Sequence, residues 1–149
     1  MRELFREYEQ ALGVDLCFQG FAAELASLPG KYAPPRGRLY LAHADDGIAG
    51  CVGLRPASET AAELKRLYVR AAFRGQHLGR KLTERAIADA RAFGFGAVVL
   101  DTLPSMKEAH ALYASLGFRE CAPYTASAVP GTQFLELPLA PAASQKAFL

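Results

Sequence analysis

Segment 67–82, LYVRAAFRGQHLGRKL, contains two glycines and several arginines where a strand pattern gives way to a helix pattern. The strand pattern ends at Val69, and the helical repeat begins near His77. The first turn of a helix has backbone N–H groups without intrahelical partners and carries the positive end of the helix dipole, so it attracts anions. The segment therefore predicts a phosphate or diphosphate site. The residues that would admit such a group to the backbone or add positive charge are Arg74, Gly75, Gly79 and Arg80.

The same segment excludes two common nucleotide sites. It lacks the Gly-Lys-Ser/Thr ending of the ATP-binding P-loop, and it lacks the G-x-G-x-x-G spacing of dinucleotide-binding folds. The remaining interpretation is the diphosphate of another cofactor, and the alternative is an ordinary helix start beside an arginine.

Positive charge is concentrated around this segment. The formal net charge of the chain is only +2, but the window Glu63–Arg91 holds eight lysines and arginines against three acidic residues. This window predicts an anionic partner, and the alternative is a solvated helix face. A nucleic-acid partner is not expected, because the net charge is low and aromatic residues do not alternate with the basic ones.

Length and composition limit the class of protein. With 149 residues, of which 51% are hydrophobic and 21% charged, we expect one globular domain over residues 1–140 and a loose tail over 141–149. No apolar run reaches the length of about 18 residues that a membrane span needs. A charged, amphipathic stretch follows Met1, so we expect neither a signal peptide nor a membrane partner.

The cysteines and histidines do not form a chemical motif. The cysteines are far apart and lack C-x-x-C spacing, which indicates a reduced, cytoplasmic location. The histidines lack metal-ligand spacing, so we predict no metal. These residues are Cys17, Cys51 and Cys121, and His43, His77 and His110.

Hydrophobic periodicity predicts the elements that must position the site. Gly13, Gly94 and Gly117 mark helix ends, and Asp46-Gly47 favours a hairpin. Ser105 and Glu108 have the spacing of a capping box at the start of the last helix. The order of elements predicts one mixed sheet flanked by helices, an α/β fold. The expected helices are 2–11, 18–27, 77–93 and 105–116, and the expected strands are 39–42, 48–54, 61–69, 97–101, 118–121 and 133–137.

Two motifs resemble those of the GCN5-related N-acetyltransferases (GNAT). The family pattern Arg/Gln-x-x-Gly-x-Gly/Ala follows a Leu-Tyr-Val-like strand end, and segment 67–82 is similar to it. The segment 111–120, ALYASLGFRE, is similar to the family's Leu-Tyr-x-x-x-Gly-Phe helix end. Two positions depart, because His77 replaces a usual glycine and Met106 a frequent asparagine. A third departure is that no strand precedes the first helix, so the sheet is expected to lack the usual first strand.

The resemblance implies a mostly antiparallel GNAT sheet with coenzyme A bound between the third and fourth strands. It also implies acetyl-CoA as co-substrate and direct attack of a primary amine on the thioester. The backbone of Leu67–Val69 would pair with the pantetheine arm, and the Val69 N–H would stabilise the oxyanion. The cofactor-binding residues implied are Leu67, Tyr68, Val69, Arg74, Gly75, Gln76, His77, Leu78, Gly79, Arg80, Ser105 and Tyr113.

Two side chains are candidates for proton transfer. Tyr113 would protonate the departing thiolate, since a phenol with a pKa near 10 can protonate a thiolate with a pKa near 8.5. The alternative for Tyr113 is a core aromatic. Glu63 would take the proton of the amine, because strand alternation puts it on the same face as Val69. The alternatives for Glu63 are an ion pair with Lys65 or Arg66, and a bulge that reverses its facing.

The acceptor is expected to be a small-molecule amine. Its pocket would be walled by the loops 15–19, 29–38 and 121–132. Loop cations fit an acceptor that also carries a carboxylate or phosphate, or are simply solvated. The competing function is a non-catalytic CoA-binding sensor, and a homodimer is expected by analogy with the family alone. The loop cations concerned are Lys31, Arg36 and Arg38.

Overall fold

The computed structural model describes residues 1–13, 16, 20–45, 47–126 and 129–140. The expected loose tail, 141–149, lies outside these residues. The helices are α1 (Arg2–Leu12), α2 (Phe21–Ser27), α3 (Leu78–Ala92) and α4 (Lys107–Ser115), with short 3-10 turns η2 (Gly30–Tyr32) and η3 (Ala71–Phe73). The strands are β1 (Arg38–Ala44), β2 (Gly47–Pro56), β3 (Ala61–Val69), β4 (Ala97–Thr102), β5 (Arg119–Glu120) and β6 (Gln133–Pro138).

The strands form one sheet in the order β1-β2-β3-β4-β6-β5, antiparallel at every step except β3 beside β4. The predicted mixed, mostly antiparallel sheet is therefore confirmed, as is the β1–β2 hairpin. In the described part of the chain α1 is the first element, and no strand precedes it. Gly13, with a φ of 70°, ends α1 as predicted.

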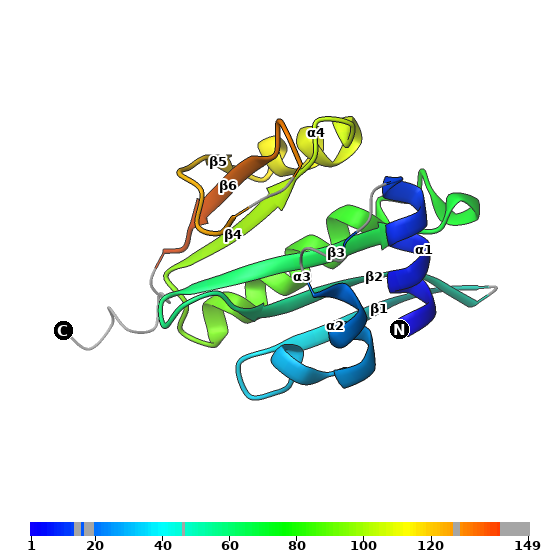
Figure 1. The fold of residues 1–149 in the computed structure, drawn as a ribbon, viewed down its shortest axis with the longest axis horizontal. Helices are drawn as coiled ribbons and strands as arrows, with labels where there is room; N and C mark the ends of the chain where they lie inside the picture. Colours follow the sequence, from blue (N-terminus) through cyan, green and yellow to red (C-terminus); the bar gives the residue numbers. More distant parts are fainter. Residues whose placement is uncertain (14–15, 17–19, 46, 127–128, 141–149) are drawn as a thin grey trace.

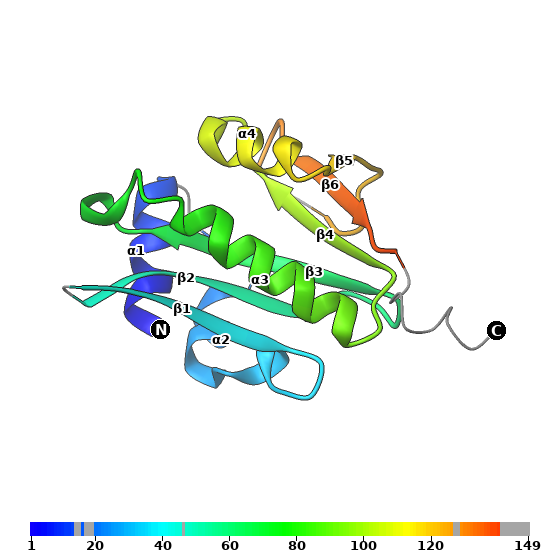
Figure 2. The ribbon, with the colours of Figure 1, turned by 180° about the vertical axis from the view of Figure 1, so that it is seen from behind.

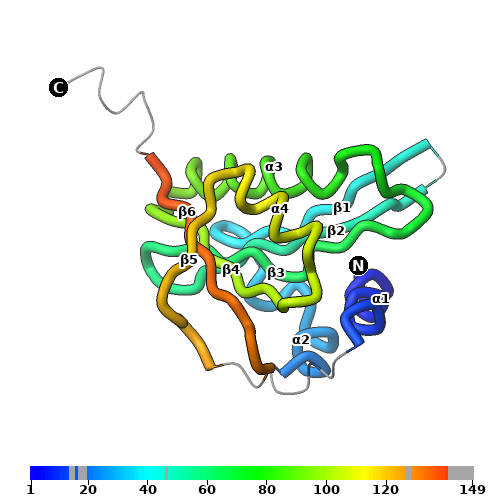
Figure 3. The backbone as a smooth tube through the Cα atoms, turned by 90° about the horizontal axis from the view of Figure 1, so that it is seen from above, coloured from blue at the N-terminus to red at the C-terminus, as the bar shows by residue number. Residues whose placement is uncertain are grey.

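Helices cover both faces of the sheet (Figures 2 and 3). Successive residues of β2 point to opposite faces, so Val52 packs toward α3 while Cys51 packs toward α1 and α2. The α3 face buries Leu82 and Ala86, and the other face buries Phe5. The sheet is thus the middle layer of three, and each face has its own apolar core.

Strands β3 and β4 pair over a short distance and then diverge (Figure 1). Their parallel pairing covers only Ala61–Glu63 against Ala97–Val99. Beyond Glu63, no strand of the described residues pairs with β3 on the β4 side. The last helix, α4, stands where the two strands are farthest apart (Figure 1). This divergence leaves the backbone of Leu67–Val69 without a strand partner on that side among the described residues.

A bulge in β3 corrects the predicted alternation. Cys51 pairs with Tyr68 and Gly53 pairs with Lys65, so Arg66 and the next residue oppose a single residue of β2. Arg66 has a φ of 63°. After the bulge, the side chains of β3 point to the faces opposite to those that regular alternation predicts. This is the alternative in which a bulge reverses the facing of Glu63 relative to Val69. The expectation that Glu63 shares a face with Val69 is therefore wrong.

The predicted capping box is also wrong. Helix α4 begins at Lys107, its N-cap is Met106, and no side chain of the described residues caps it. Ser105 lies before the helix in the groove described below.

A buried ion pair holds the bulge in place. The Arg66 side chain is 3% exposed, and its Nε and Nη2 donate to the two carboxylate oxygens of Glu24 at 3.0 and 3.1 Å. Burial raises the pKa of Glu24, but the hydrogen bonds and charge of Arg66, together with the charge of Arg55, outweigh it and lower that pKa. The ionised form of Glu24 is therefore stabilised by the folded state.

Replacing Glu24 by alanine should lower the free energy of unfolding by about 3 kcal/mol, because it removes the carboxylate from a buried guanidinium. Denaturant titration measures this. The contribution is complete above the ordinary pKa of 4.5 and is lost as pH falls through the lowered folded-state value. As a control, Glu59→Ala removes a fully exposed partner of Arg36 and should change stability by less than about 0.5 kcal/mol. Equal effects of the two variants would contradict this account.

Candidate functional site

A long groove runs between the end of β3 and the start of α3 on one side and α4 on the other. Its volume is about 900 Å³. All the predicted cofactor-binding residues except Gln76 and Tyr113 line it, and Gln76 lies in the turn that forms one rim. The predicted cofactor-binding residues that line the groove are Leu67, Tyr68, Val69, Arg74, Gly75, His77, Leu78, Gly79, Arg80 and Ser105.

The N-terminus of α3 opens into this groove without a cap. Within the described residues no side chain bonds to its first turn, which contains no acidic residue. The first intrahelical bond joins the Lys81 N–H to the His77 carbonyl, so the preceding helical N–H groups have no intrahelical partner. A Cβ at Gly79 would come no closer than 3.8 Å to another residue, so the helix start is sterically open. These features fit a diphosphate.

His77 starts α3 in a backbone conformation that glycine adopts more easily. Its φ is 60° and that of Gly75 is 86°, so the turn into α3 uses two left-handed residues. A side chain in this conformation costs about 1–2 kcal/mol, whereas glycine adopts it freely. His77 thus carries backbone strain at the predicted anion site.

Two arginines are fixed at the rim of the groove. The Arg74 Nε donates to the Val69 carbonyl at 3.0 Å. Arg80 donates to the Ser115 hydroxyl at 2.6 Å and pairs with Glu84 at 3.5 Å. Both guanidinium groups therefore sit beside the uncapped helix start and add to its positive potential.

The backbone of β3 presents donors to the same groove. The Arg70 N–H bonds to Ala49 of β2, and neighbouring residues of an antiparallel strand point their N–H groups in opposite directions. The Val69 N–H is therefore directed toward the edge that β4 leaves open. This direction is the one required of the predicted oxyanion donor.

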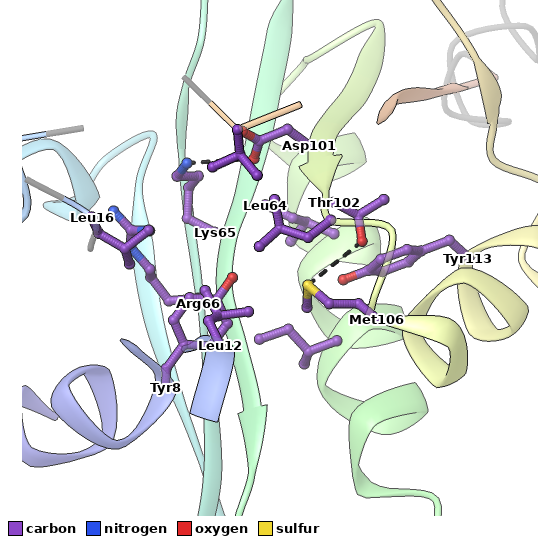
Figure 4. Close-up of a pocket in the computed structure, with 13 residues that line it drawn as sticks. Tyr8, Leu12, Leu16, Leu64, Lys65, Arg66, Asp101, Thr102, Met106 and Tyr113 are labelled. Atoms are coloured by element: carbon purple, nitrogen blue, oxygen red, sulfur yellow. Dashed lines mark hydrogen bonds and ion pairs between the residues drawn. The ribbon is translucent and has the colours of Figure 1, made fainter. Parts of the chain in front are cut away.

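A small pocket of about 30 Å³ continues the groove into the divergence of β3 and β4. Leu67 and Met106 line both spaces. Figure 4 shows the Tyr113 hydroxyl turned toward Met106. The Tyr113 side chain is 5% exposed, and among the described residues its hydroxyl makes no hydrogen bond. Burial, reinforced by the charge of Asp101, raises the pKa of Tyr113 and keeps the phenol protonated.

A polar cavity of about 350 Å³ lies beyond the small pocket, and Lys65 and Asp101 line both. Figure 4 shows these two side chains facing each other across the divergence. Their charged atoms are 3.6 Å apart. The small pocket thus shares lining residues with both the groove and the polar cavity and lies between them. The polar cavity is lined by Lys31, Arg55, Pro56, Ala57, Glu63, Lys65, Asp101, Tyr124, Thr125 and Ala126.

The two carboxylates of the polar cavity are not equivalent. Glu63 accepts the Arg55 Nε–H at 3.0 Å on one oxygen and the Tyr124 hydroxyl at 2.7 Å on the other. Lys65 lies 3.9 Å from that second oxygen. The contact of Asp101 with Lys65, at 3.6 Å, is its one ion pair among the described residues. Asp101 therefore has fewer partners than Glu63, which makes it the carboxylate that is better able to accept a proton.

Lys65 lies between these carboxylates. It is 7% exposed, and burial lowers its pKa, although the negative charges of Glu63 and Asp101 act in the opposite direction. A cation in this position orients both carboxylates toward the divergence of the strands.

Sequence reasoning did not identify Asp101 or Tyr124 as site residues. Asp101 was predicted only as the last residue of an apolar strand, and a carboxylate ending a buried strand is the signal that could have identified it. Two loop cations are remote from the cavity. Arg36 pairs with Glu59 and stacks on Phe95, and Arg38 pairs with Asp89. The expectation that they face the acceptor is wrong, and the part of loop 15–19 other than Leu16 lies outside the described residues.

In the ranges given above, no helix has both the length and the apolar character to cross a bilayer. Among the same residues, no three His, Cys, Asp or Glu side chains gather as a metal site would require.

Comparison with known proteins gives a consistent result. Residues 1–118 match the model of the Acetyltransferase (GNAT) family. An uncharacterized N-acetyltransferase of Schizosaccharomyces pombe is 39% identical over 136 residues, which cover 90% of this chain and 83% of that protein. A GNAT-family acetyltransferase of Staphylococcus aureus has the same fold, with a TM-score of 0.78 and 21% identity over 93% of each chain. A GNAT-family acetyltransferase of Elizabethkingia anophelis, solved with acetyl-CoA bound, has a TM-score of 0.59 and 26% identity over 70% of this chain and 77% of that one.

Replacing His77 by glycine should raise the free energy of unfolding by about 0.5–1 kcal/mol, because glycine relieves the left-handed strain and its own chain entropy offsets part of the gain. Thermal or denaturant unfolding measures the change. The matched control is Gln76→Gly in the same turn, where φ is not positive, and this variant should be destabilised. If His77→Gly is destabilised as much as the control, no strain is stored at His77.

Proposed function

The chain belongs to the acetyltransferase (GNAT) family, whose members use acetyl-CoA, and we propose that it acetylates the primary amine of a small molecule by direct attack on the thioester. One observation carries this proposal. The groove that suits coenzyme A and the polar cavity that suits an acceptor open on either side of the same small pocket, and they share lining residues with it. Two substrates could therefore meet there without an acyl-enzyme.

The groove supports binding of acetyl-CoA through backbone groups. The uncapped start of α3 suits the diphosphate, with Arg74 and Arg80 adding charge at the rim. The open edge of β3 suits the amide arm. Acetyl-CoA, when bound, supplies an activated carbonyl carbon, and the Val69 N–H would stabilise negative charge on the carbonyl oxygen.

Transfer forms one N–C bond and breaks the C–S bond, so a proton leaves the acceptor nitrogen and another reaches the sulfur. The position of Tyr113 supports it as the proton donor to the sulfur, because its buried hydroxyl lines the small pocket. Burial raises the pKa of Tyr113, so the phenol stays protonated but is a weaker acid, and it would give up its proton only as negative charge develops on the sulfur.

The proton of the acceptor requires a carboxylate near the divergence of the strands. Glu63, the residue favoured by sequence, uses both oxygens in hydrogen bonds. Asp101 lies next to the small pocket with fewer partners, so we assign it as the base. Glu63 then acts as a positioning residue, because it holds Lys65, which in turn faces Asp101.

Tyr113→Phe should lower turnover about 100-fold, the usual contribution of a general acid, while leaving acetyl-CoA binding unchanged. The assay is release of the CoA thiol across a panel of small amines, with thermal stabilisation by acetyl-CoA measured in parallel. Tyr40→Phe is the matched control, because the Tyr40 hydroxyl bonds to Asp89 away from the groove.

The possible outcomes distinguish three claims: the acid role of Tyr113, the enzymatic activity, and the assignment of the groove to acetyl-CoA. Turnover that survives Tyr113→Phe would remove Tyr113 from the mechanism. Stabilisation by acetyl-CoA without turnover on any amine would favour a CoA-binding sensor over an enzyme of small amines. Absence of stabilisation would contradict the assignment of the groove.

Asp101→Asn should lower kcat by about 100-fold or more with little change in KM, because the amide cannot accept the proton. Glu63→Gln should reduce kcat by less than about tenfold, since it changes only a positioning group. Both are measured as separate kcat and KM values on protein checked for folding by thermal unfolding. The reverse ranking would assign the base to Glu63.

A further inference from the structure

The polar cavity contains more positive than negative charge. Three cations from different elements line it, Lys31 from η2, Arg55 from β2 and Lys65 from β3. Two carboxylates, Glu63 and Asp101, face them. The formal charge of the lining is therefore positive before any substrate enters.

The cavity has an inner and an outer end. Lys65 and Asp101 also line the small pocket, so they mark the inner end where transfer would occur. Lys31 and Arg55 line only the polar cavity and mark the outer end. Lys31 is exposed, and within the described residues it has neither an ion pair nor a hydrogen bond.

Charge complementarity limits what this cavity can accept. A plain alkylammonium would add a positive charge to a lining that already has a positive excess, which is unfavourable at short range. An anionic group on the same molecule removes that penalty and gives Lys31 a partner. Arg55 offers a planar guanidinium beside it, held in place by the Glu63 carboxylate at 3.0 Å.

We infer that the acceptor is a small primary amine that also carries an anionic group, a carboxylate or phosphate, several bonds from the nitrogen. The amine end lies at Asp101 and the anionic end at Lys31 and Arg55. A volume of about 350 Å³ suits a molecule of this size. The inference rests on the proposed function, because it names the substrate class of the same site.

Other side chains lie between the two ends of the cavity. A chain of ion pairs, Asp101 to Lys65 at 3.6 Å, Lys65 to Glu63 at 3.9 Å and Glu63 to Arg55 at 3.0 Å, joins Asp101 at the inner end to Arg55 at the outer end. Since Lys65 and Glu63 come between them, the outer cations suit an anion that is several bonds from the amine.

The test compares matched acceptors that differ only in the anionic group. β-Alanine and γ-aminobutyrate are paired with propylamine and butylamine, and O-phosphoethanolamine provides the phosphate arm. At least one anionic acceptor should exceed the matched alkylamine in kcat/KM by about tenfold or more. Lys31→Met should raise KM for that acceptor about five- to tenfold, leave kcat unchanged, and leave the alkylamine unaffected. Arg91→Met, which removes an exposed cation from the last turn of α3, is the control and should change neither.

Failure of this inference differs from failure of the proposed function. Turnover of alkylamines equal to that of the anionic acceptors, or a Lys31→Met effect shared by both, would overturn the inference while the enzyme assignment stands. Preference for the phosphate arm alone would support the inference and identify the anion. No turnover on any amine, with stabilisation by acetyl-CoA intact, would overturn both.

Discussion

The ion pair between Arg66 and Glu24 holds the one irregular residue in the central strand of the site. Arg66 combines a left-handed φ of 63° with a side chain that is 3% exposed. A charge so deeply buried is tolerated because a carboxylate of α2 meets it with two hydrogen bonds. The extra residue then reverses the facing of β3, so that Lys65 faces the polar cavity while Val69 faces the groove near α3.

This reversal of side-chain facing matters because β4 diverges from β3. Parallel pairing of β3 with β4 stops at Glu63, and within the described ranges no strand pairs with the rest of that edge. A flat, regular strand beside a full-length partner would close the gap with backbone bonds. The bulge and the divergence together place the groove near α3 on one face of the sheet and the polar cavity on the other, with the small pocket between them.

The sequence predicted the elements well because hydrophobic period and glycine stops are local signals. The anion-binding turn was predictable for the same reason, since a strand end, Gly75 and a helix start are adjacent in the chain. The facing of Glu63 was not predictable, because nothing local distinguishes a regular strand from a bulged one. The cap at Ser105 failed because α4 starts two residues later, at Lys107. Asp101 escaped notice because its role depends on Lys65, which is distant in sequence.

A chain of charges that crosses β3 explains why one carboxylate differs from the other. Six groups alternate in sign, and each inner member has a partner of opposite charge on both sides. The last member has a partner on one side only and borders the small pocket, where Tyr113 holds a proton that burial makes harder to lose. In the proposed reaction, Tyr113 would give one proton to the sulfur, and Asp101, at the end of the chain of ion pairs, would take the other from the amine. In order, the chain is Arg66, Glu24, Arg55, Glu63, Lys65 and Asp101.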